Sequence, residues 1–316
     1  MAGKDFTALR IVFMGTPAFA VASLDALVKS GCNVVGVVTA PDKPGGRGML
    51  LQESAVKKYA MEHQLPVLQP EKLKNPAFID ELRTLKADLQ IVVAFRMLPE
   101  VVWNMPAMGS VNLHGSLLPQ YRGAAPINWA VMNGEKETGV TTFKLKHEID
   151  TGDILLQESF PIAADDDAGI VHDRMMELGA KVLVKTVVGL ADGSIHEKAQ
   201  SISKNLSEDS LKHAPKIFTE TCEINFNHTT AAVHNFIRGL SPYPAAFSFL
   251  HGKKIKVFTA KKIMTEPTHE PGIVHTDEKT FLYFACKDGY ISVLNLQLEG
   301  KNRMPVQDFL RGYRFN

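Results

Sequence analysis

Three polar residues near the middle of the chain have the side-chain types that proton transfer and oxyanion stabilisation require. Asn112 and His114 lie two residues apart at the end of a predicted strand, so their side chains point to the same side. An amide and an imidazole can both donate to an oxygen that becomes negative, and a carboxylate at Asp150 can orient the histidine and a proton-carrying water. The three residues predict direct acyl transfer, although Asn112 and His114 could equally serve only to tie down a tight loop.

A serine nucleophile is a competing interpretation, because Ser116 follows His114 closely. No Gly-x-Ser-x-Gly elbow surrounds Ser116, and a separation of two residues makes it difficult for the histidine to face the hydroxyl in a tight turn. The turn Gly15-Thr-Pro-Ala-Phe-Ala20 also lacks the second and third glycines of a dinucleotide fingerprint. A serine hydrolase and a tightly bound nicotinamide or flavin cofactor are therefore not expected.

The elements that must position these residues follow the order of a doubly wound α/β sheet that is mostly parallel and Rossmann-like. Apolar runs and helical periodicity predict strands at 10–15, 33–39, 89–95, 110–112, 139–146 and 154–162, and helices at 18–30, 54–62, 75–85, 99–103, 126–133 and 168–192. The stretch 89–95 should be central. Ligands bind beyond the carboxyl ends of strands in such sheets, where Phe95, Asn112 and His114 are expected.

Residues 40–51 form an unusual connection with two prolines and three glycines, which predict irregular structure. The segment is longer than the roughly 2–6 residues of an ordinary βα connection. Lys43 and Arg47 give it positive charge. No Gly-Lys-Ser/Thr follows, so it is not a Walker A loop. A functional loop is expected, with a solvated loop as the alternative.

Three consecutive acids, Asp165 to Asp167, precede the last predicted helix of the first part and can cap it. We expect this role rather than metal binding, and no metal site is predicted. The composition then becomes polar, as in a linker. Beyond it we predict short strands and one helix: strands at 222–226, 246–249, 254–260, 280–284 and 290–296, and a helix at 230–240. This order favours a smaller OB-like β-barrel.

The length of 316 residues suggests two domains, which we place at 1–193 and 212–316 with a linker at 194–211. No apolar run approaches the roughly 20 residues that span a bilayer, and the first residues lack an export signal, so a cytoplasmic protein without a membrane partner is expected. The cysteines are few, odd in number and far apart, which predicts buried thiols in a reducing compartment. Nothing requires more than a monomer.

Charge is distributed unevenly along the chain. Residues 1–210 contain 21 Lys and Arg against 25 Asp and Glu, whereas residues 211–316 contain 14 against 9. The basic last part favours contact with a polyanion, and a solvated basic surface is an equally good interpretation of charge alone.

Several motifs resemble the signature of the folate-dependent formyltransferases. The matching stretches extend over nearly the whole chain: Phe13-Met-Gly-Thr-Pro17, Pro41-Asp-Lys-Pro-Gly-Gly-Arg-Gly48, Val92-Val-Ala94, Asn112-Leu-His114-Gly-Ser116-Leu-Leu-Pro119, Tyr121-Arg-Gly-Ala-Ala-Pro126, Asp150-Thr-Gly-Asp153, Ala214-Pro-Lys216 and Ser241-Pro-Tyr-Pro244. The Gly-Gly-Arg-Gly loop and the basic C-terminal part resemble the members that formylate initiator methionyl-tRNA rather than those that act on sugar nucleotides.

The resemblance implies a role for each candidate residue. Asn112 and His114 would stabilise the oxyanion, and Asp150 would orient His114 and a water. The co-substrate 10-formyltetrahydrofolate, which is not tightly bound, would lie against Val92, Val93, Phe95, Ser116, Leu117, Leu118 and Pro119. Lys43 and Arg47 would contact the acceptor stem of the tRNA, and the basic C-terminal domain its backbone.

Two departures from the family pattern affect these expectations. The family often continues Arg-Gly with lysines, whereas Met49-Leu50-Leu51 follow here, so charge in the loop is concentrated on Lys43 and Arg47. The strand end often has Ala-Tyr-Gly, whereas this chain has Ala94-Phe95-Arg96. The folate pocket at that strand end is therefore expected to differ.

Overall fold

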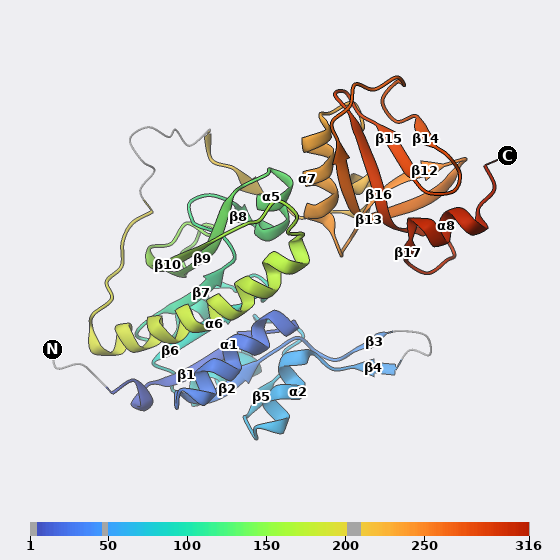
Figure 1. Ribbon diagram of the computed structural model, residues 1–316. Coiled ribbons are helices and arrows are strands. Elements are labelled where there is room, and N and C mark those ends of the chain that lie inside the picture. Colours follow the sequence, from blue (N-terminus) through green and yellow to red (C-terminus); the bar gives the residue numbers. More distant parts are fainter. Residues whose placement is uncertain (1–4, 46–49, 201–209, 316) are drawn as a thin grey trace. The chain divides into compact units, whose positions relative to one another are not determined.

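The computed structural model describes residues 5–45, 50–200 and 210–315, and the chain divides into two compact units (Figure 1). The first unit consists of Met1–Arg122, Gly139–Ser159 and Asp173–Lys212, and the second of Gly123–Thr138, Phe160–His172 and His213–Asn316. The chain passes between the units more than once, whereas the predicted domains are continuous in sequence. Those boundaries stay a prediction, and residues 201–209 of the predicted linker lie outside the described residues.

A seven-stranded sheet in the order β10-β9-β7-β6-β1-β2-β5 forms the centre of the first unit. Its strands are β1 (Arg10–Gly15), β2 (Asn33–Val38), β5 (Val67–Leu68), β6 (Leu89–Val93), β7 (Ser110–His114), β9 (Glu137–Lys144) and β10 (Ile154–Pro161). The five neighbouring strands β5, β2, β1, β6 and β7 pair in parallel, and β9 runs antiparallel to β7. The predicted mostly parallel α/β sheet is confirmed, with β6 near its centre.

Helices pack against the sheet, and the contacts of one of them show to which face the site residues point. The helices are α1 (Ala18–Lys29), α2 (Ala55–Glu62), α3 (Pro76–Thr84), α4 (Glu100–Trp103) and α6 (Ala168–Asp192). A Cβ added to Gly179 of α6 would lie 2.9 Å from Leu113, and Thr186 of α6 contacts Thr142 of β9 through their hydroxyls at 2.8 Å. Leu113 therefore points toward α6, and its neighbours Asn112 and His114 point to the opposite face.

Residues 40–51 contain a hairpin, so the prediction of irregular structure was wrong. Strands β3 (Lys43–Gly45) and β4 (Leu50–Gln52) pair antiparallel and form a separate two-stranded sheet. Each strand of such a ribbon has an edge without a ladder, so the missing N–H of Pro44 is tolerated. The connecting residues 46–49 lie outside the described residues.

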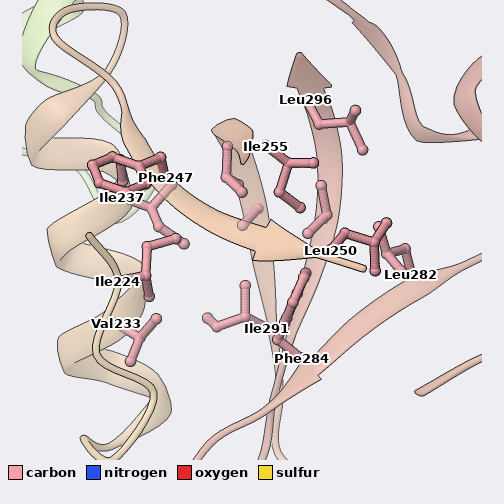
Figure 2. Close-up of a cluster of buried hydrophobic side chains, with 14 of the residues drawn as sticks. Ile224, Val233, Ile237, Phe247, Leu250, Ile255, Leu282, Phe284, Ile291 and Leu296 are labelled. Atoms are coloured by element: carbon pink, nitrogen blue, oxygen red, sulfur yellow. The ribbon is translucent and has the colours of Figure 1, made fainter. Parts of the chain in front are cut away.

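A curled antiparallel half-barrel forms most of the second unit. Its sheet has the order β12-β13-β16-β15-β14, with β17 paired to β16. Its elements are β12 (Ala246–Leu250), β13 (Lys253–Ile263), β14 (Val274–Thr276), β15 (Leu282–Ala285), β16 (Tyr290–Leu298), β17 (Met304–Pro305), α5 (Pro126–Met132), α7 (Thr230–Leu240) and α8 (Val306–Gly312). Figure 2 shows part of the core, to which α7 contributes Ile237, β12 contributes Phe247 and β15 contributes Phe284. These strands and α7 confirm the OB-like prediction.

The predicted strand at 222–226 was wrong. A short 3-10 helix, Thr219–Cys222, occupies its beginning, and only Glu223 forms a bridge, to Phe247. The alternation of Cys222, Ile224 and Phe226 has a different cause, since all three are buried in the core of the second unit. An apolar residue at every second position thus marks burial here without a continuous ladder.

All three cysteines are buried and free, Cys32 in the first unit and Cys222 and Cys286 in the second. Burial raises the pKa of each thiol, to about 11 for Cys32 and Cys286. Among the described residues, no helix has both the length and the apolar character needed to cross a bilayer.

Candidate active site

Strand β7 brings Asn112 and His114 to the carboxyl end of the parallel sheet. Asn112 lies between Val92 of β6 and Phe143 of β9 in the register, and His114 is the last residue of β7. The Asn112 side chain is half-buried and makes no hydrogen bond to any residue that the structure describes. Its amide N–H groups are therefore available to a bound molecule.

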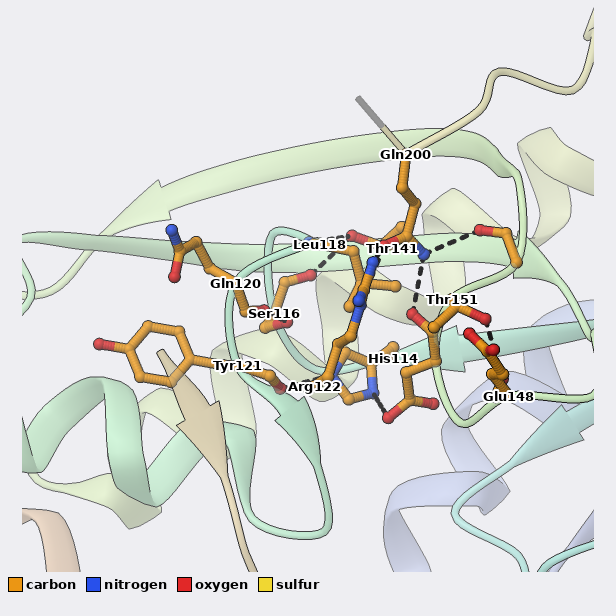
Figure 3. Close-up of polar contacts among 12 residues, drawn as sticks. His114, Ser116, Leu118, Gln120, Tyr121, Arg122, Thr141, Glu148, Thr151 and Gln200 are labelled. Atoms are coloured by element: carbon orange, nitrogen blue, oxygen red, sulfur yellow. Dashed lines mark hydrogen bonds and ion pairs between the residues drawn. The ribbon is translucent and has the colours of Figure 1, made fainter. Parts of the chain in front are cut away.

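His114 is buried, with 6% of its side chain exposed, and both ring nitrogens have a neighbour. Nε2 lies 2.9 Å from the carbonyl oxygen of Tyr121, and Nδ1 lies 3.7 Å from Oδ2 of Asp150 (Figure 3). A carbonyl only accepts, so Nε2 carries the hydrogen of the first contact. The distance to Asp150 is longer than a direct hydrogen bond. Nδ1 is thus the nitrogen left to handle a proton, with a carboxylate beside it.

Asp150 reaches His114 from the connection between β9 and β10. Its backbone is left-handed, with φ of +56°, a region that aspartate tolerates better than most residues, and its side chain is 12% exposed. Two residues later, a Cβ on Gly152 would lie 1.6 Å from the carbonyl oxygen of Lys144, so only glycine fits there. The Asp-Thr-Gly-Asp motif is therefore a backbone arrangement that directs Asp150 toward β7.

A single hydroxyl fixes the loop that follows His114. Thr141 Oγ1 donates to the carbonyl oxygen of Ser116 at 2.6 Å and accepts from the N–H of Leu118 at 3.1 Å. Gln157 Nε2 donates both to Thr141 Oγ1 and to the carbonyl oxygen of Leu118, each at 2.9 Å. Leu118 is buried, and Leu117 and Pro119 are half-buried. The predicted folate-facing loop is thus held rigidly beside Asn112 and His114.

The serine-nucleophile interpretation lacks the contact that it needs. Ser116 is fully buried, and its Oγ donates to the carbonyl oxygen of Gln120 at 2.6 Å. His114 Nε2 is committed to Tyr121. The Ser116 hydroxyl therefore closes a turn and is not activated by the histidine.

The end of β6 places the other predicted folate contacts next to β7. Val92 and Val93 are buried and pair with Asn112 and Leu113. Phe95 is half-buried, and the Arg96 guanidinium lies 5.5 Å from the centre of its ring. Arg96 also donates to the carbonyl oxygens of Pro70 and Glu71. Phe95 and Arg96 are the residues that differ from the family pattern. Through the Arg96 hydrogen bonds, the end of β6 is connected to the segment after β5.

The basic hairpin is anchored at its base. Lys43 is exposed on β3, while Arg47 lies outside the described residues. Next to Lys43, the Asp42 carboxylate binds Lys57 of α2 and accepts from Gln69 at 2.8 Å. The Lys57 hydrogen bond lowers the pKa of the Asp42 carboxyl. The structure therefore brings Asn112, His114, Asp150 and the 116–119 loop together within the first unit, and holds Lys43 on a separate anchored ribbon.

Sequence reasoning missed three residues of this arrangement: Thr141, Gln157 and Gln200. Gln200 hydrogen-bonds the Asp150 loop from the predicted linker. Thr141 lies in a correctly predicted strand, but its hydroxyl partners are far away in sequence, so no local pattern indicates them. Within the part of the chain that the structure describes, no group of three His, Cys, Asp or Glu side chains is placed to hold a metal ion.

We expect Thr141→Val to lower stability and to weaken use of the folate that the resemblance implies. Valine keeps the shape but leaves the Ser116 carbonyl and the Leu118 N–H unpaired, which lowers the free energy of unfolding by about 1–3 kcal/mol. The KM for the folate should rise in steady-state assays, and urea unfolding should report the stability. Thr142→Val is a matched control, because Thr142 also loses a buried hydroxyl contact, to Thr186 on the opposite face. An equal KM change in both variants would contradict the loop's role.

The mostly parallel sheet and the half-barrel agree with the comparison with protein families. The model of the formyl transferase family matches residues 9–187, and that of the formyl transferase C-terminal domain matches residues 216–314. The chain belongs to the formyl transferase family.

Two relatives of the chain have a name more specific than that of the family. A methionyl-tRNA formyltransferase of Parabacteroides distasonis is 57% identical over 97% of this chain and 96% of its own, and one of Bacteroides fragilis is 56% identical over 96% and 95%. Among solved structures, an N-formyltransferase from Helicobacter canadensis, in complex with folinic acid and dTDP-3-aminofucose, has a TM-score of 0.67. It is 21% identical over 90% of this chain and 98% of that one, which shows a shared fold.

Proposed function

We propose that this chain transfers the formyl group of 10-formyltetrahydrofolate to the α-amino group of methionine on initiator methionyl-tRNA. The observation that carries the proposal is the contact of His114 with Asp150 beside the available amide of Asn112. The chain also resembles, at 56–57% identity, relatives that are named methionyl-tRNA formyltransferase. The product, formylmethionyl-tRNA, serves translation initiation in the cytoplasm, and a monomer suffices for the reaction.

The proposed mechanism is direct attack without a covalent enzyme intermediate. Asn112 polarises the formyl carbonyl and donates to the oxyanion of the tetrahedral intermediate. His114 Nδ1 is the second donor when it carries a proton in addition to the one that Nε2 donates to Tyr121. The methionine amine attacks the formyl carbon, and its proton leaves by way of a water held by Asp150 and His114. The bond between carbon and folate N10 then breaks, and N10 takes up a proton. An α-amino group with a pKa of about 8 is neutral often enough near pH 7 to attack once it is positioned.

The folate is proposed to lie against the loop Ser116–Pro119 and the strand end Val92, Val93 and Phe95. The support is that Thr141 holds this loop and that Val92 pairs directly with Asn112, so a ligand on these residues presents its formyl group to the amide. The related Helicobacter canadensis enzyme was solved with folinic acid.

The tRNA is proposed to meet the Lys43 and Arg47 ribbon with its acceptor stem and the basic C-terminal part with its backbone. The support is the excess of 14 Lys and Arg over 9 Asp and Glu in residues 211–316, because phosphate contacts follow positive charge. Binding should therefore weaken steeply as the salt concentration rises.

The test offers labelled 10-formyltetrahydrofolate with three acceptors: initiator methionyl-tRNA, elongator methionyl-tRNA and an amino-sugar nucleotide. The expected result is transfer to initiator methionyl-tRNA in preference to the other two. Transfer only to the sugar nucleotide, the acceptor class of the Helicobacter canadensis complex, would overturn the proposal.

Arg47→Ala should impair tRNA use more than folate use. Lys43 and Arg47 are the cations of the 40–51 segment, so losing one weakens phosphate contacts and leaves the folate loop unchanged. Steady-state assays should show a higher KM for methionyl-tRNA with a KM for the folate close to that of the unchanged protein. Lys58→Ala, on α2, is the control for losing a cation elsewhere in the first unit. Equal changes in both KM values would indicate a purely structural segment.

A further inference from the structure

The Gln200 side chain joins two segments that are far apart in sequence. Its Nε2 donates to the carbonyl oxygens of Asp150 and Gly152, each at 2.8 Å (Figure 3). Its Oε1 accepts from Arg122 through Nε at 3.2 Å and Nη2 at 2.6 Å. All three groups belong to the first unit. One amide therefore connects the backbone that carries Asp150 to the arginine that follows Tyr121, whose carbonyl holds His114.

The backbone of Gln200 is itself anchored. Lys198, two residues before it, exchanges two backbone hydrogen bonds with Ile154 of β10, at 2.7 and 2.9 Å. The Asp150 loop is thus held between β10 and the Gln200 side chain. This matters because the left-handed backbone at Asp150 is intrinsically unfavourable for a residue with a Cβ, and such conformations persist only where several contacts enforce them.

The hydrogen bonds determine which way the amide faces. Arg122 has only donors, so it must meet Oε1, and the two carbonyls only accept, so they must meet Nε2. Glutamate cannot replace glutamine in this arrangement. It would keep the Arg122 contact, even strengthen it, but would set a carboxylate oxygen against two carbonyl oxygens. The geometry therefore requires the amide itself and not only a side chain of this length.

We infer that Gln200 is a positioning residue for formyl transfer, which holds the Asp150 loop so that the carboxylate stays beside His114. The inference rests on the proposed function for its kinetic readout. Arg122 orients Gln200, and Gln200 fixes the carbonyls on either side of Thr151. Residues that orient the ligands of a metal site in this indirect way typically change activity by about 10- to 100-fold when they are removed, and we expect a loss of the same order here.

The test compares Gln200→Glu with Gln200→Ala in the full-length protein. Both should lower kcat for methionyl-tRNA formylation by about 10- to 100-fold with little change in the KM for the folate. Amide hydrogen exchange of residues 150–153 should become faster in both. In an Asp150→Asn background, Gln200→Glu should have almost no further effect on kcat, because the two residues act through the same group. Gln64→Glu is the control for the added charge, since Gln64 is exposed in the first unit and lies outside the proposed folate and tRNA contacts.

Three outcomes would overturn the inference. Near-normal kcat in Gln200→Glu would mean that turnover depends on the Arg122 contact and not on the hydrogen bonds to the Asp150 and Gly152 carbonyls. An undiminished loss in the Asp150→Asn background would mean that Gln200 acts elsewhere. Unchanged hydrogen exchange at 150–153 would mean that it does not hold the loop. The exchange measurement needs no substrate, so it remains decisive if the unaltered protein fails to formylate methionyl-tRNA, a result that would count against the proposed function instead.

Discussion

Replacing His114 with alanine is expected to lower kcat/KM for formyl transfer by about 100- to 1,000-fold. The imidazole is 6% exposed and its Nδ1 faces Asp150. Alanine therefore removes both the proposed second oxyanion donor and the group proposed to lie beside the departing proton. Single-turnover assays with saturating folate and methionyl-tRNA would measure the loss in the chemical step. Binding of tRNA should be retained, because the contacts proposed for it lie on other residues.

His147→Ala is the control for that substitution. His147 lies on the same connection as Asp150, and its side chain is 85% exposed. Its replacement should leave turnover nearly unchanged. Asn112→Ala should behave like His114→Ala, since its amide is the other proposed donor. Near-normal turnover in either site variant would remove that residue from the mechanism.

Asp150→Asn is expected to lower kcat by about 100- to 10,000-fold, the range that general acid–base catalysis commonly supplies. Asparagine keeps the shape and the tolerance for a left-handed backbone, so the loop should remain in place. What is lost is the carboxylate beside His114 that is proposed to hold a proton-carrying water. The shape of the pH–rate profile should change, because the variant has no carboxylate at this position.

Asp153→Asn separates this effect from a general loss of charge. Asp153 lies in the same motif, but its carboxylate forms an ion pair with Lys146 at 2.7 Å. The Lys146 side chain is half-exposed, and an ion pair of this kind contributes at most about 1 kcal/mol to stability. Its replacement should alter the pH–rate profile little. An unchanged profile in Asp150→Asn would contradict a proton role for Asp150.

Regular elements could be predicted wherever apolar residues recur with a clear period. Strands β1, β2, β6 and β7 lie within a few residues of their predicted ranges because their buried faces determine the pattern. The hairpin of β3 and β4 was missed because the prolines and glycines of residues 40–51 are typical of irregular loops. The two strands pair with each other, outside the main sheet. The short edge strand β14 has too few residues for a period to be recognised.

The candidate site divides in the same way. Asn112 and His114 are two apart on one strand, so local geometry already places them together. Asp150 could be named as a partner, but its approach depends on a left-handed backbone and on Gly152 fitting against Lys144, neither of which has a periodic signature. Gln200 lies 50 residues beyond Asp150 in a polar stretch, and only the folded chain connects them.

The buried cysteines allow local unfolding of each unit to be followed by chemical modification of its thiols. A thiol with a pKa near 11 is about one part in a thousand thiolate at pH 8, and the thiolate is the species that alkylating reagents attack. Reaction at Cys32 or Cys286 therefore has to wait until the surrounding structure opens. Mapping the alkylated peptides over time would report the opening of the parallel sheet through Cys32 and of the half-barrel through Cys286, in the unaltered protein and without an added label.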